Sequence, residues 1–397
     1  MTLRTNLSLL FLLGAVTAAG HTAAEPVPAD TSRAQTRGTD IPVRKSGEIS
    51  YLPQVYGAVK AKMELSTTDG EYRFNVRNSR IGVKGFVSPS MRYAVQVDFN
   101  NEGKISILDS YVTYFRKNFE FTLGQQQYKF SSDLDRGPSS NMFANRSFIA
   151  KYLTSYYGST LAGDQAEEYV KTIGSRDIGA LGRYSFRAGI PMRVTVGVFN
   201  GSGSNNPEWS KSVNLSTRLD IGKREGLGGA ASFYTGRTPL DVHVVETDGV
   251  KKEEDFTQKI RMWGCELHYV GDRFLIEAEV AQRILFDKEK DIITAAHIQG
   301  YYQFGLPRNG FAEHIAPIAR WDTGHGVDFL NSQTKLHDRF NANRMTIGVN
   351  FGLSPKLLKS ELRLNYEKYF LGHHKPSDFA ANKLLQDKFT IEVVASF

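Results

Sequence analysis

Hydrophobic and polar residues alternate along most of the chain from Ser50 onward. The clearest segment is 91–100, in which every second residue is apolar: Met91, Tyr93, Val95, Val97 and Phe99. A repeat of two places successive side chains on opposite faces of a β-strand. The pattern therefore predicts strands that have one apolar face and one polar face.

The same alternation recurs in sixteen segments. They are 55–63, 72–84, 91–100, 104–116, 118–130, 176–187, 192–200, 211–221, 226–236, 257–270, 272–286, 292–305, 311–322, 341–353, 359–370 and 388–397. In the second segment the pattern changes phase near Asn78, which predicts a β-bulge. The chain allows about 22 residues for each strand and its connection, and a tilted membrane-spanning strand needs about 9–11 of them. Strand ends inferred from a pattern are accurate to about 2–4 residues, so a count of 14 or 18 strands also stays open.

The first 24 residues follow a different pattern. Arg4 precedes an apolar run from Leu7 to Val16, and small residues follow up to Ala24, as in a secretory signal peptide. The expected cleavage point follows Ala24, with Gly20 as the alternative, and a buried first helix is the competing interpretation. Residues 25–49 contain three prolines and no periodicity, which predicts a flexible periplasmic lead-in. The expected organisation is a signal peptide at 1–24, the lead-in at 25–49 and a single β-domain at 50–397.

Composition narrows the class of protein. Beyond the N-terminus there is no run of about 18 apolar residues, which excludes a helical membrane protein. The 25 Phe and 18 Tyr supply too much apolar surface for a disordered chain. The single cysteine, Cys265, excludes an internal disulfide. The net charge of +7 is spread along the chain and is too small for a nucleic-acid-binding protein.

Three features favour a transmembrane barrel over a water-soluble sandwich. Aromatic residues cluster at the expected strand ends, in 111–121, 301–304 and 366–370, as girdles at the membrane surface require. The signal peptide places the chain outside the cytoplasm. The last segment ends in Phe397 and resembles the recognition signal of bacterial outer-membrane proteins. The expected fold is an all-β, transmembrane, antiparallel up-and-down β-barrel of about 16 strands over 50–397, in the outer membrane of a Gram-negative bacterium.

Several short motifs stand out. They are FNVRNSRIGVKGFVSPSMRYAVQVDF at 74–99, LDSYVTYF at 108–115, GQQQYKF at 124–130, RDIGALG at 176–182, VFNG at 198–201 and STRLDI at 216–221. Together they resemble the phosphate-selective porin O/P family. The resemblance implies a 16-stranded porin, usually trimeric, that passes small anions along a ladder of Arg and Lys. The run at 124–130 lacks the proline of the family's Gly-Gln-x-Lys-x-Pro-Phe run and carries its lysine two places later, so the solute stays open.

Strand parity places seven cations of the first three segments opposite the apolar face, toward the lumen. These candidate anion-path residues are Lys60, Lys62, Arg73, Arg77, Arg80, Lys84 and Arg92. A partly dehydrated anion passes between such groups when each attraction is weak, and Arg binds phosphate through two hydrogen bonds at once. Few acids are expected beside them. The alternative is an ordinary wet pore wall, balanced by acids such as Asp98 and Glu120.

The segment 131–175 is longer than a passive connection needs. We expect it to fold into the pore as a constriction loop, and an exposed surface loop is the alternative. The candidate constriction residues are Lys129, Arg136, Arg146 and Lys151. A second charged stretch, Asp241 to Asp255, is expected to be a surface loop.

Motifs for catalysis and for nucleotide binding are absent, so neither an enzyme nor a cofactor is expected. Asp133 and Asp135 resemble the start of a calcium loop without its glycine and glutamate, and His373 and His374 stand beside Pro376 as in a plain loop, so no metal is expected. Two functions stay open. One is a passive channel for small anions such as phosphate, with the lipid bilayer and a homotrimer as its other partners. The second is a structural or adhesive outer-membrane protein whose exposed loops carry the function, and an outer-membrane hydrolase is a third that lacks a supporting motif.

Overall fold

The computed structural model describes residues 50–397, except 102–103, 154–155, 158–171, 208, 210–211, 224, 248–249, 287–289, 308–309, 331–336, 354–358 and 373–384. The expected signal peptide, the lead-in at 25–49 and the pair His373 and His374 lie outside these residues. Among the described residues, no helix is long and apolar enough to cross a membrane.

Strands account for most of the described chain. Their bounds are β1 Gln54–Ser66, β2 Tyr72–Ser88, β3 Met91–Asn101, β4 Lys104–Arg116, β5 Phe119–Gln127, β6 Tyr156–Tyr157, β7 Thr172–Ile173, β8 Arg176–Ala188, β9 Ile190–Phe199, β10 Asn214–Gly222, β11 Gly226–Thr247, β12 Val250–Val270, β13 Phe274–Phe286, β14 Lys290–Tyr302, β15 Phe304–Gly305, β16 Ala312–Leu330, β17 His337–Leu353, β18 Lys359–Phe370 and β19 Lys388–Ser396. Two short helical pieces follow β5, namely α1 at Ser132–Asp135 and the π-helical turn η1 at Ile149–Leu153.

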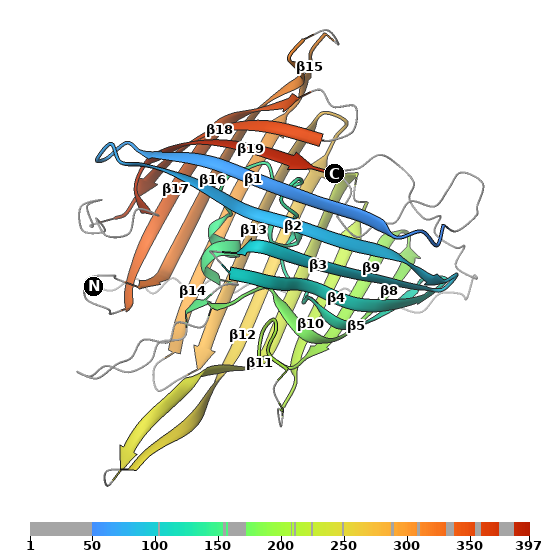
Figure 1. Ribbon diagram of the computed structural model, residues 1–397, viewed down its shortest axis with the longest axis vertical. Helices are drawn as coiled ribbons and strands as arrows, with labels where there is room; N and C mark the ends of the chain where they lie inside the picture. The colour runs from blue at the N-terminus through green and yellow to red at the C-terminus, as the bar shows by residue number, and fades with distance from the viewer. Residues whose placement is uncertain are drawn as a thin grey trace.

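The strands close into one barrel (Figure 1). Each strand pairs antiparallel with the next barrel strand, and β1 pairs with both β2 and β19. Both β14 and β15 pair with β16, so they are two parts of one interrupted strand. The 17-stranded sheet of the described chain therefore has 16 strands around the barrel. This confirms the predicted fold class and strand number.

The two faces of each strand differ in burial. In β1, Val55 and Val59 are 61% and 43% exposed, while Lys60 and Lys62 between the outward residues are 4% and 5% exposed. Apolar side chains therefore cover the outside of the barrel and polar side chains point inward, which is the reverse of a soluble sandwich. The register of β1 and β2 shifts opposite Asn78, whose φ is 65°, so the predicted bulge is confirmed.

The hairpin of β11 and β12 continues well past the predicted segments. The two strands stay paired up to Thr247 and Val250, and the hairpin projects from the barrel (Figure 1). The expected surface loop at Asp241 to Asp255 is therefore wrong in form, because these residues belong to a paired hairpin. The β-branched valines at 242, 244 and 245 favour extended pairing over an irregular loop.

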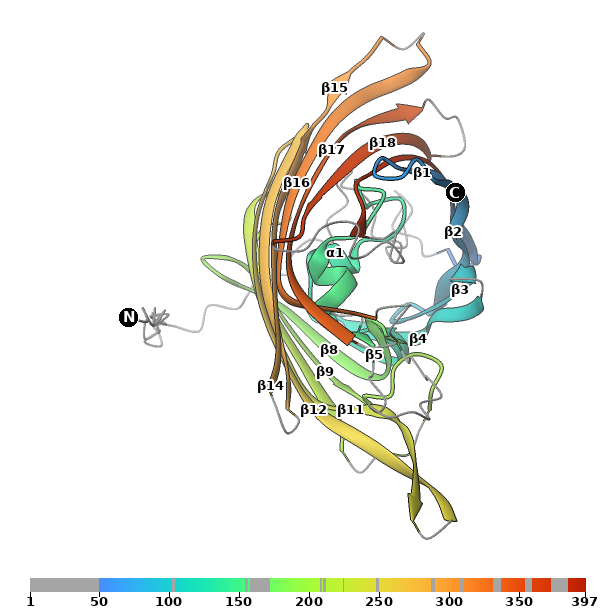
Figure 2. The ribbon, with the colours of Figure 1, turned by 90° about the vertical axis from the view of Figure 1, so that its left-hand side faces the viewer.

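The segment after β5 turns back into the barrel, and Figure 2 shows α1 inside the ring of strands. Its apolar side chains explain this path, because Phe143, Phe148 and Leu153 are fully buried. Phe143 packs in a cluster with Leu275 and Ile318, which lie on the inner face of β13 and β16. The predicted inward-folded loop is confirmed, and the alternative of an exposed surface loop is wrong for the described part of this segment.

Candidate functional site: the lumen and its inner loop

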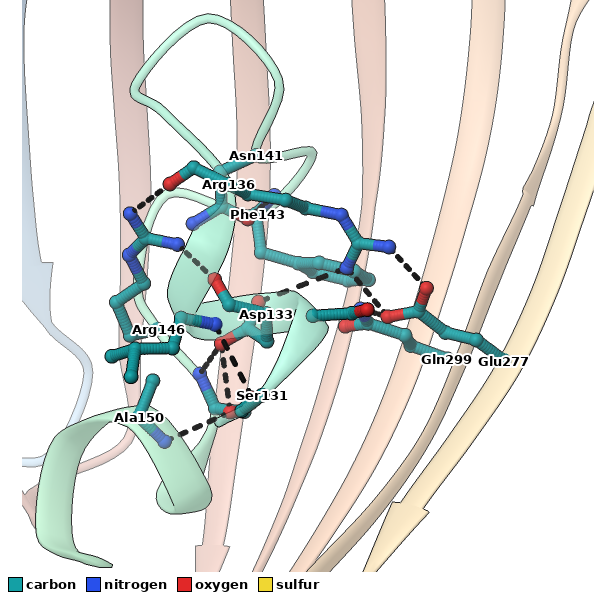
Figure 3. Close-up of polar contacts among 12 residues, drawn as sticks. Ser131, Asp133, Arg136, Asn141, Phe143, Arg146, Ala150, Glu277 and Gln299 are labelled. Carbon is teal, nitrogen blue, oxygen red and sulfur yellow. Dashed lines mark hydrogen bonds and ion pairs between the residues drawn. The ribbon is translucent and has the colours of Figure 1, made fainter. Parts of the chain in front are cut away.

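The inner loop, residues 128–153, is held together by its own polar groups (Figure 3). The backbone N–H of Leu134 donates to Ser131 Oγ at 3.3 Å and so caps α1. Ser147 Oγ donates to the Asp133 carboxylate at 2.8 Å. The Arg146 guanidinium donates to the backbone oxygens of Asp133 and Arg136. These bonds tie the two ends of the loop into one unit.

The pKa values of Asp133 and Arg146 are both shifted by burial and by the charges around the inner loop. Burial opposes ionisation of Asp133, but the nearby Arg146 and His297 outweigh it and hold the pKa of Asp133 at about 2. Burial also lowers the pKa of Arg146 to about 10, and the charges of Arg80 and Arg77 act in the same direction. Arg146 therefore lies within electrostatic reach of the β2 wall.

Five arginines on the barrel wall across from β1–β5 donate hydrogen bonds to the backbone of the inner loop. Each donates to a loop carbonyl oxygen: Arg218 to Phe130 at 3.1 Å, Arg283 to Tyr152 at 3.3 Å, Arg320 to Asn145 at 2.9 Å, Arg344 to Arg146 at 2.7 Å and Arg363 to Pro138 at 3.5 Å. They come from β10, β13, β16, β17 and β18. Irregular backbone that is removed from water needs such donors. We call these residues the anchor arginines.

Buried carboxylates balance the anchor arginines. Asp322 accepts from both Arg320 and Arg344 at 2.8 Å, and Glu392 lies 3.0 Å from Arg363. Taking such charges out of water is costly unless each is paired and hydrogen-bonded. Each of these carboxylates pairs with an anchor arginine, so the loop and its wall form one connected polar network.

Arg136 makes a further link between the loop and the wall (Figure 3). Its guanidinium pairs with Glu277 on β13, and Gln299 on β14 donates to the same carboxylate. Glu277 raises the pKa of Arg136 above its ordinary value, against the effect of burial. This expected constriction residue therefore fixes the loop in place.

Five of the seven candidate anion-path residues have a carboxylate partner. The pairs are Lys60 with Glu392 at 3.1 Å, Lys62 with Glu64 at 2.7 Å, Arg73 with Glu64 at 2.6 Å, Arg80 with Asp98 at 2.8 Å and Arg92 with Glu120 at 3.1 Å. The expectation of few acids beside them is wrong. The cause is strand register, because Asp98 lies directly opposite Arg80 and Glu64 directly opposite Arg73. The alternative of a balanced wet wall describes these five residues better.

The other two wall residues of the prediction are Lys84 and Arg77. Lys84 is buried and its ammonium lies 5.2 Å from the centre of the Tyr56 ring. Arg77, in the bulge of β2, has no carboxylate partner among the described side chains. Their roles in an anion path stay predictions.

The two remaining loop cations, Lys129 and Lys151, also differ in whether a carboxylate lies nearby. Lys129 lies 3.4 Å from Asp135. The ammonium of Lys151 lies 4.7 Å from the centre of the Tyr152 ring and meets no carboxylate within the part of the chain that the structure describes. Burial lowers the pKa of Lys151 well below its ordinary value, and the positive charges of Lys388, Arg344 and Arg77 add to this effect. Arg77, Arg146 and Lys151 thus share one positive region.

The wall of β4, β5 and β8 carries two cations that the prediction omitted. Arg183 lies 3.3 Å from Glu120, the acid that also meets Arg92, and Arg176 lies 2.9 Å from Asp109. Strand parity was a sufficient signal for Arg183, whereas Arg176, at the first residue of β8, has the opposite parity. The anchor arginines had the same signal, but their partners on the loop lie more than 60 residues away along the chain.

Neither aspartate of the calcium-like motif is arranged for a metal. Asp133 accepts from Ser147, and Asp135 pairs with Lys129. Over the described ranges, no group of three or more His, Cys, Asp or Glu side chains is placed to hold a metal ion.

Solved structures similar to this chain are outer-membrane porins. OmpT of Vibrio cholerae in its trimer form matches with a TM-score of 0.53 and 13% identity, over 87% of this chain and 98% of that one. OprB of Pseudomonas putida gives 0.55 and 10%, over 87% and 94%. An anion-selective porin from Comamonas acidovorans gives 0.52 and 10%, over 87% and 98%.

No family model matches the chain, and no curated protein sequence does. At identities of 10–13% the structural matches establish the fold. The chain is a closed 16-stranded barrel of the outer-membrane porin type. These comparisons do not assign the chain to the phosphate-selective porins rather than to another group of porins.

Proposed function

We propose that the chain is a channel of the bacterial outer membrane, through which small hydrophilic solutes diffuse and anions pass in preference to cations. The observation that carries the proposal is the positive region of Arg77, Arg146 and Lys151. Arg146 and Lys151 interact electrostatically with Arg77 of the β2 wall, and Arg77 and Lys151 form no ion pair with a carboxylate among the described residues, whereas Arg146 is partly balanced by Asp133. The lumen is polar and the outside apolar, as a water-filled membrane channel requires.

Charge pairing explains why this region sets the selectivity. A cation that touches a carboxylate presents a dipole to a passing ion, whose field falls off quickly with distance. A cation without such a partner presents its full charge and attracts anions at a constriction. We therefore assign the anion preference mainly to Arg77, because burial favours the neutral form of Lys151. The paired residues Lys60, Lys62, Arg73, Arg80 and Arg92 form a nearly neutral lining.

Phosphate is the anion that the family resemblance suggests, and it enters the proposal as a candidate solute. Two of the five N–H donors of Arg146 already bind loop carbonyls, so Arg77 and Lys151 are the proposed phosphate-binding side chains. We extend the proposal to export by the signal peptide at 1–24, with residues 25–49 as a periplasmic lead-in, and to a homotrimer.

The test is single-channel conductance of the refolded protein in a planar bilayer under a KCl gradient. A reversal potential that is shifted toward the chloride equilibrium potential supports an anion channel. Block by added phosphate at sub-millimolar concentration identifies phosphate as a ligand. Open channels without selectivity would remove the anion assignment and keep the channel. Protein that is shown to be folded but forms no channels would contradict the proposal.

The projecting hairpin favours a second candidate function. The strands at Gly226–Thr247 and Val250–Val270 extend far beyond the barrel wall, where a passive channel needs only a short turn (Figure 1). A structural or adhesive protein would use this hairpin to contact partners. Deletion of 241–255 should leave conductance unchanged if the chain is only a channel, and should abolish adhesion of bacteria that express it if the second function holds.

A further inference from the structure

A cationic cleft lies on the outer surface of the barrel, at the base of the β11–β12 hairpin. Its volume is about 390 Å³, and its lining includes Ser212, Thr235, Arg237, Lys259, Arg261 and Phe286. Arg237 lies directly opposite Lys259 in the ladder, and Thr235 lies opposite Arg261. The three cations therefore occupy neighbouring positions, within about 5–8 Å of one another at their Cβ atoms.

Strand parity shows that these cations point away from the lumen. On the same strands, Tyr234 and Met262 point inward and are 5% and 1% exposed, as does Ile260, which also borders the cleft and is 2% exposed. Arg237, Lys259 and Arg261 have the opposite parity and are exposed. The three cations are thus separate from the pore and from the positive region of Arg77, Arg146 and Lys151.

The cleft lies at one edge of the apolar outer band. Below Arg261 on the outward face of β12 come Leu267 and Tyr269, which are 59% and 48% exposed. Arg261 and Tyr269 are eight residues apart, which is about 26 Å along a strand and about 20 Å along the membrane normal at a tilt of about 40°. The lipid-facing band of such barrels is about 25 Å tall. Arg261 therefore lies just inside the edge of this band, and Lys259 and Arg237, two residues further along, lie at the level of lipid headgroups.

Like charges this close repel one another unless an anion bridges them. In the described part of the molecule, no carboxylate pairs with Arg237, Lys259 or Arg261, and the Arg261 guanidinium lies 5.3 Å from the centre of the Phe286 ring. Lys368 provides a contrast. Lys368 also points outward, near the end of β18 on the same side of the membrane as the cleft. It pairs with Asp387 at 3.4 Å.

We propose that this cleft binds the phosphate-bearing headgroup of a lipid in the outer leaflet of the membrane. Guanidinium and ammonium groups form strong, charge-assisted hydrogen bonds to phosphate oxygens, and the cleft is large enough for one such headgroup. The acyl chains of the lipid would lie on the apolar side chains below, among them Phe233 and Leu267. The inference rests on the outer-membrane location in the proposed function and is independent of conduction.

The test is a binding titration of the full, refolded chain in detergent micelles with diphosphorylated lipid A. The double variant Lys259→Ala/Arg261→Ala should bind about tenfold more weakly or worse, because it loses two of three charged donors. The matched control Lys368→Ala should bind like the parent protein. Lipid A without its phosphates should bind the parent protein as weakly as diphosphorylated lipid A binds the double variant.

Three results would overturn the proposal. The first is equal affinity of the parent protein and the double variant, and the second is equal affinity for the two forms of lipid A. The third is displacement of the lipid by inorganic phosphate at an equal concentration, which would assign the cleft to soluble phosphate. The single variant Arg237→Ala, at an exposed position, provides the same comparison if the double variant does not refold.

Conductance of the same variants separates this proposal from the function of the pore. The double variant should conduct like the parent protein, since its changes lie outside the lumen. A barrel that binds the lipid and forms no channel would contradict the proposed function and leave the lipid site standing.

Discussion

The two sides of the lumen use arginine in different ways. Arg283, Arg320, Arg344 and Arg363 are at most 2% exposed and donate to the backbone of the inner loop. Across the lumen, the side chains of Arg92 and Arg183 are each 23% exposed and face acids of their own wall. An inward arginine is therefore not in itself an ion-path residue. Whether the loop covers it decides if it holds the fold together or meets the solute.

The largest effect is expected from removing an anchor arginine. Arg344→Ala leaves Asp322 and Glu367 with less compensation and frees the carbonyl of Arg146, so the free energy of unfolding should fall by about 3–5 kcal/mol. Denaturant unfolding in detergent measures this loss, and the released loop should also change single-channel conductance. Unchanged stability and conductance would show that the loop is held without the anchor arginines.

A smaller effect is expected inside the loop, at Asp133. Its pKa is held at about 2, below the ordinary value of 3.8, so its ionised form stabilises the fold above about pH 4, and this contribution is lost as the pH falls toward 2. Asp133→Asn should cost about 2 kcal/mol at neutral pH. Unfolding curves from pH 7 to pH 2 should show the parent protein and the variant converging in acid. A constant difference across this range would contradict the assignment.

A change at Arg77 tests the lumen wall that the inner loop leaves open to the solute. Arg77→Gln removes a charge that has no carboxylate partner among the described residues, so stability should change by less than about 0.5 kcal/mol. The ratio of anion to cation permeability should fall about twofold or more, as measured by the reversal potential in a KCl gradient. Lys368→Ala, outside the lumen, is the control with no expected shift. A larger shift from Arg80→Gln than from Arg77→Gln would mean that charge pairing does not determine selectivity.

The smallest effect is expected at Arg92. Glu120 keeps Arg183 as a partner when Arg92 is changed to alanine, and all three side chains are partly exposed. The cost should stay below about 0.5 kcal/mol, in line with exposed ion pairs. A loss that approaches that of Arg344→Ala would remove the distinction between the two walls.

Local pattern was sufficient to predict the barrel. A period of two fixes which face each side chain takes, so strand number, the inward position of Lys60 and Lys62 and the bulge at Asn78 all follow from neighbours in sequence. The length of the segment 131–175 likewise indicated a loop that folds into the pore. The extension of the β11–β12 hairpin was missed because its charged composition outweighed its β-branched valines.

Pairing across the lumen lies beyond local pattern. Arg80 meets Asp98 only because of the register of β2 and β3, and Arg320 meets Asn145 only because the loop crosses the barrel. Periodicity carries no information on either distance. The prediction therefore placed the cations on the correct face and assigned charge to the lumen that the structure largely neutralises.

Barrel closure has a consequence for how the chain is made. The last strand is sealed by the first, as in the pairing of Leu65 with Phe389, and Phe397 exchanges backbone hydrogen bonds with Gly57. Until β19 pairs with β1, each end of the sheet is an open edge that any other strand can join. A contact between the two ends of so long a chain also forms slowly. The sheet thus has two open edges until β1 and β19 pair. That pairing removes both edges at once, so the C-terminal strand protects the whole sheet from joining strands of other chains.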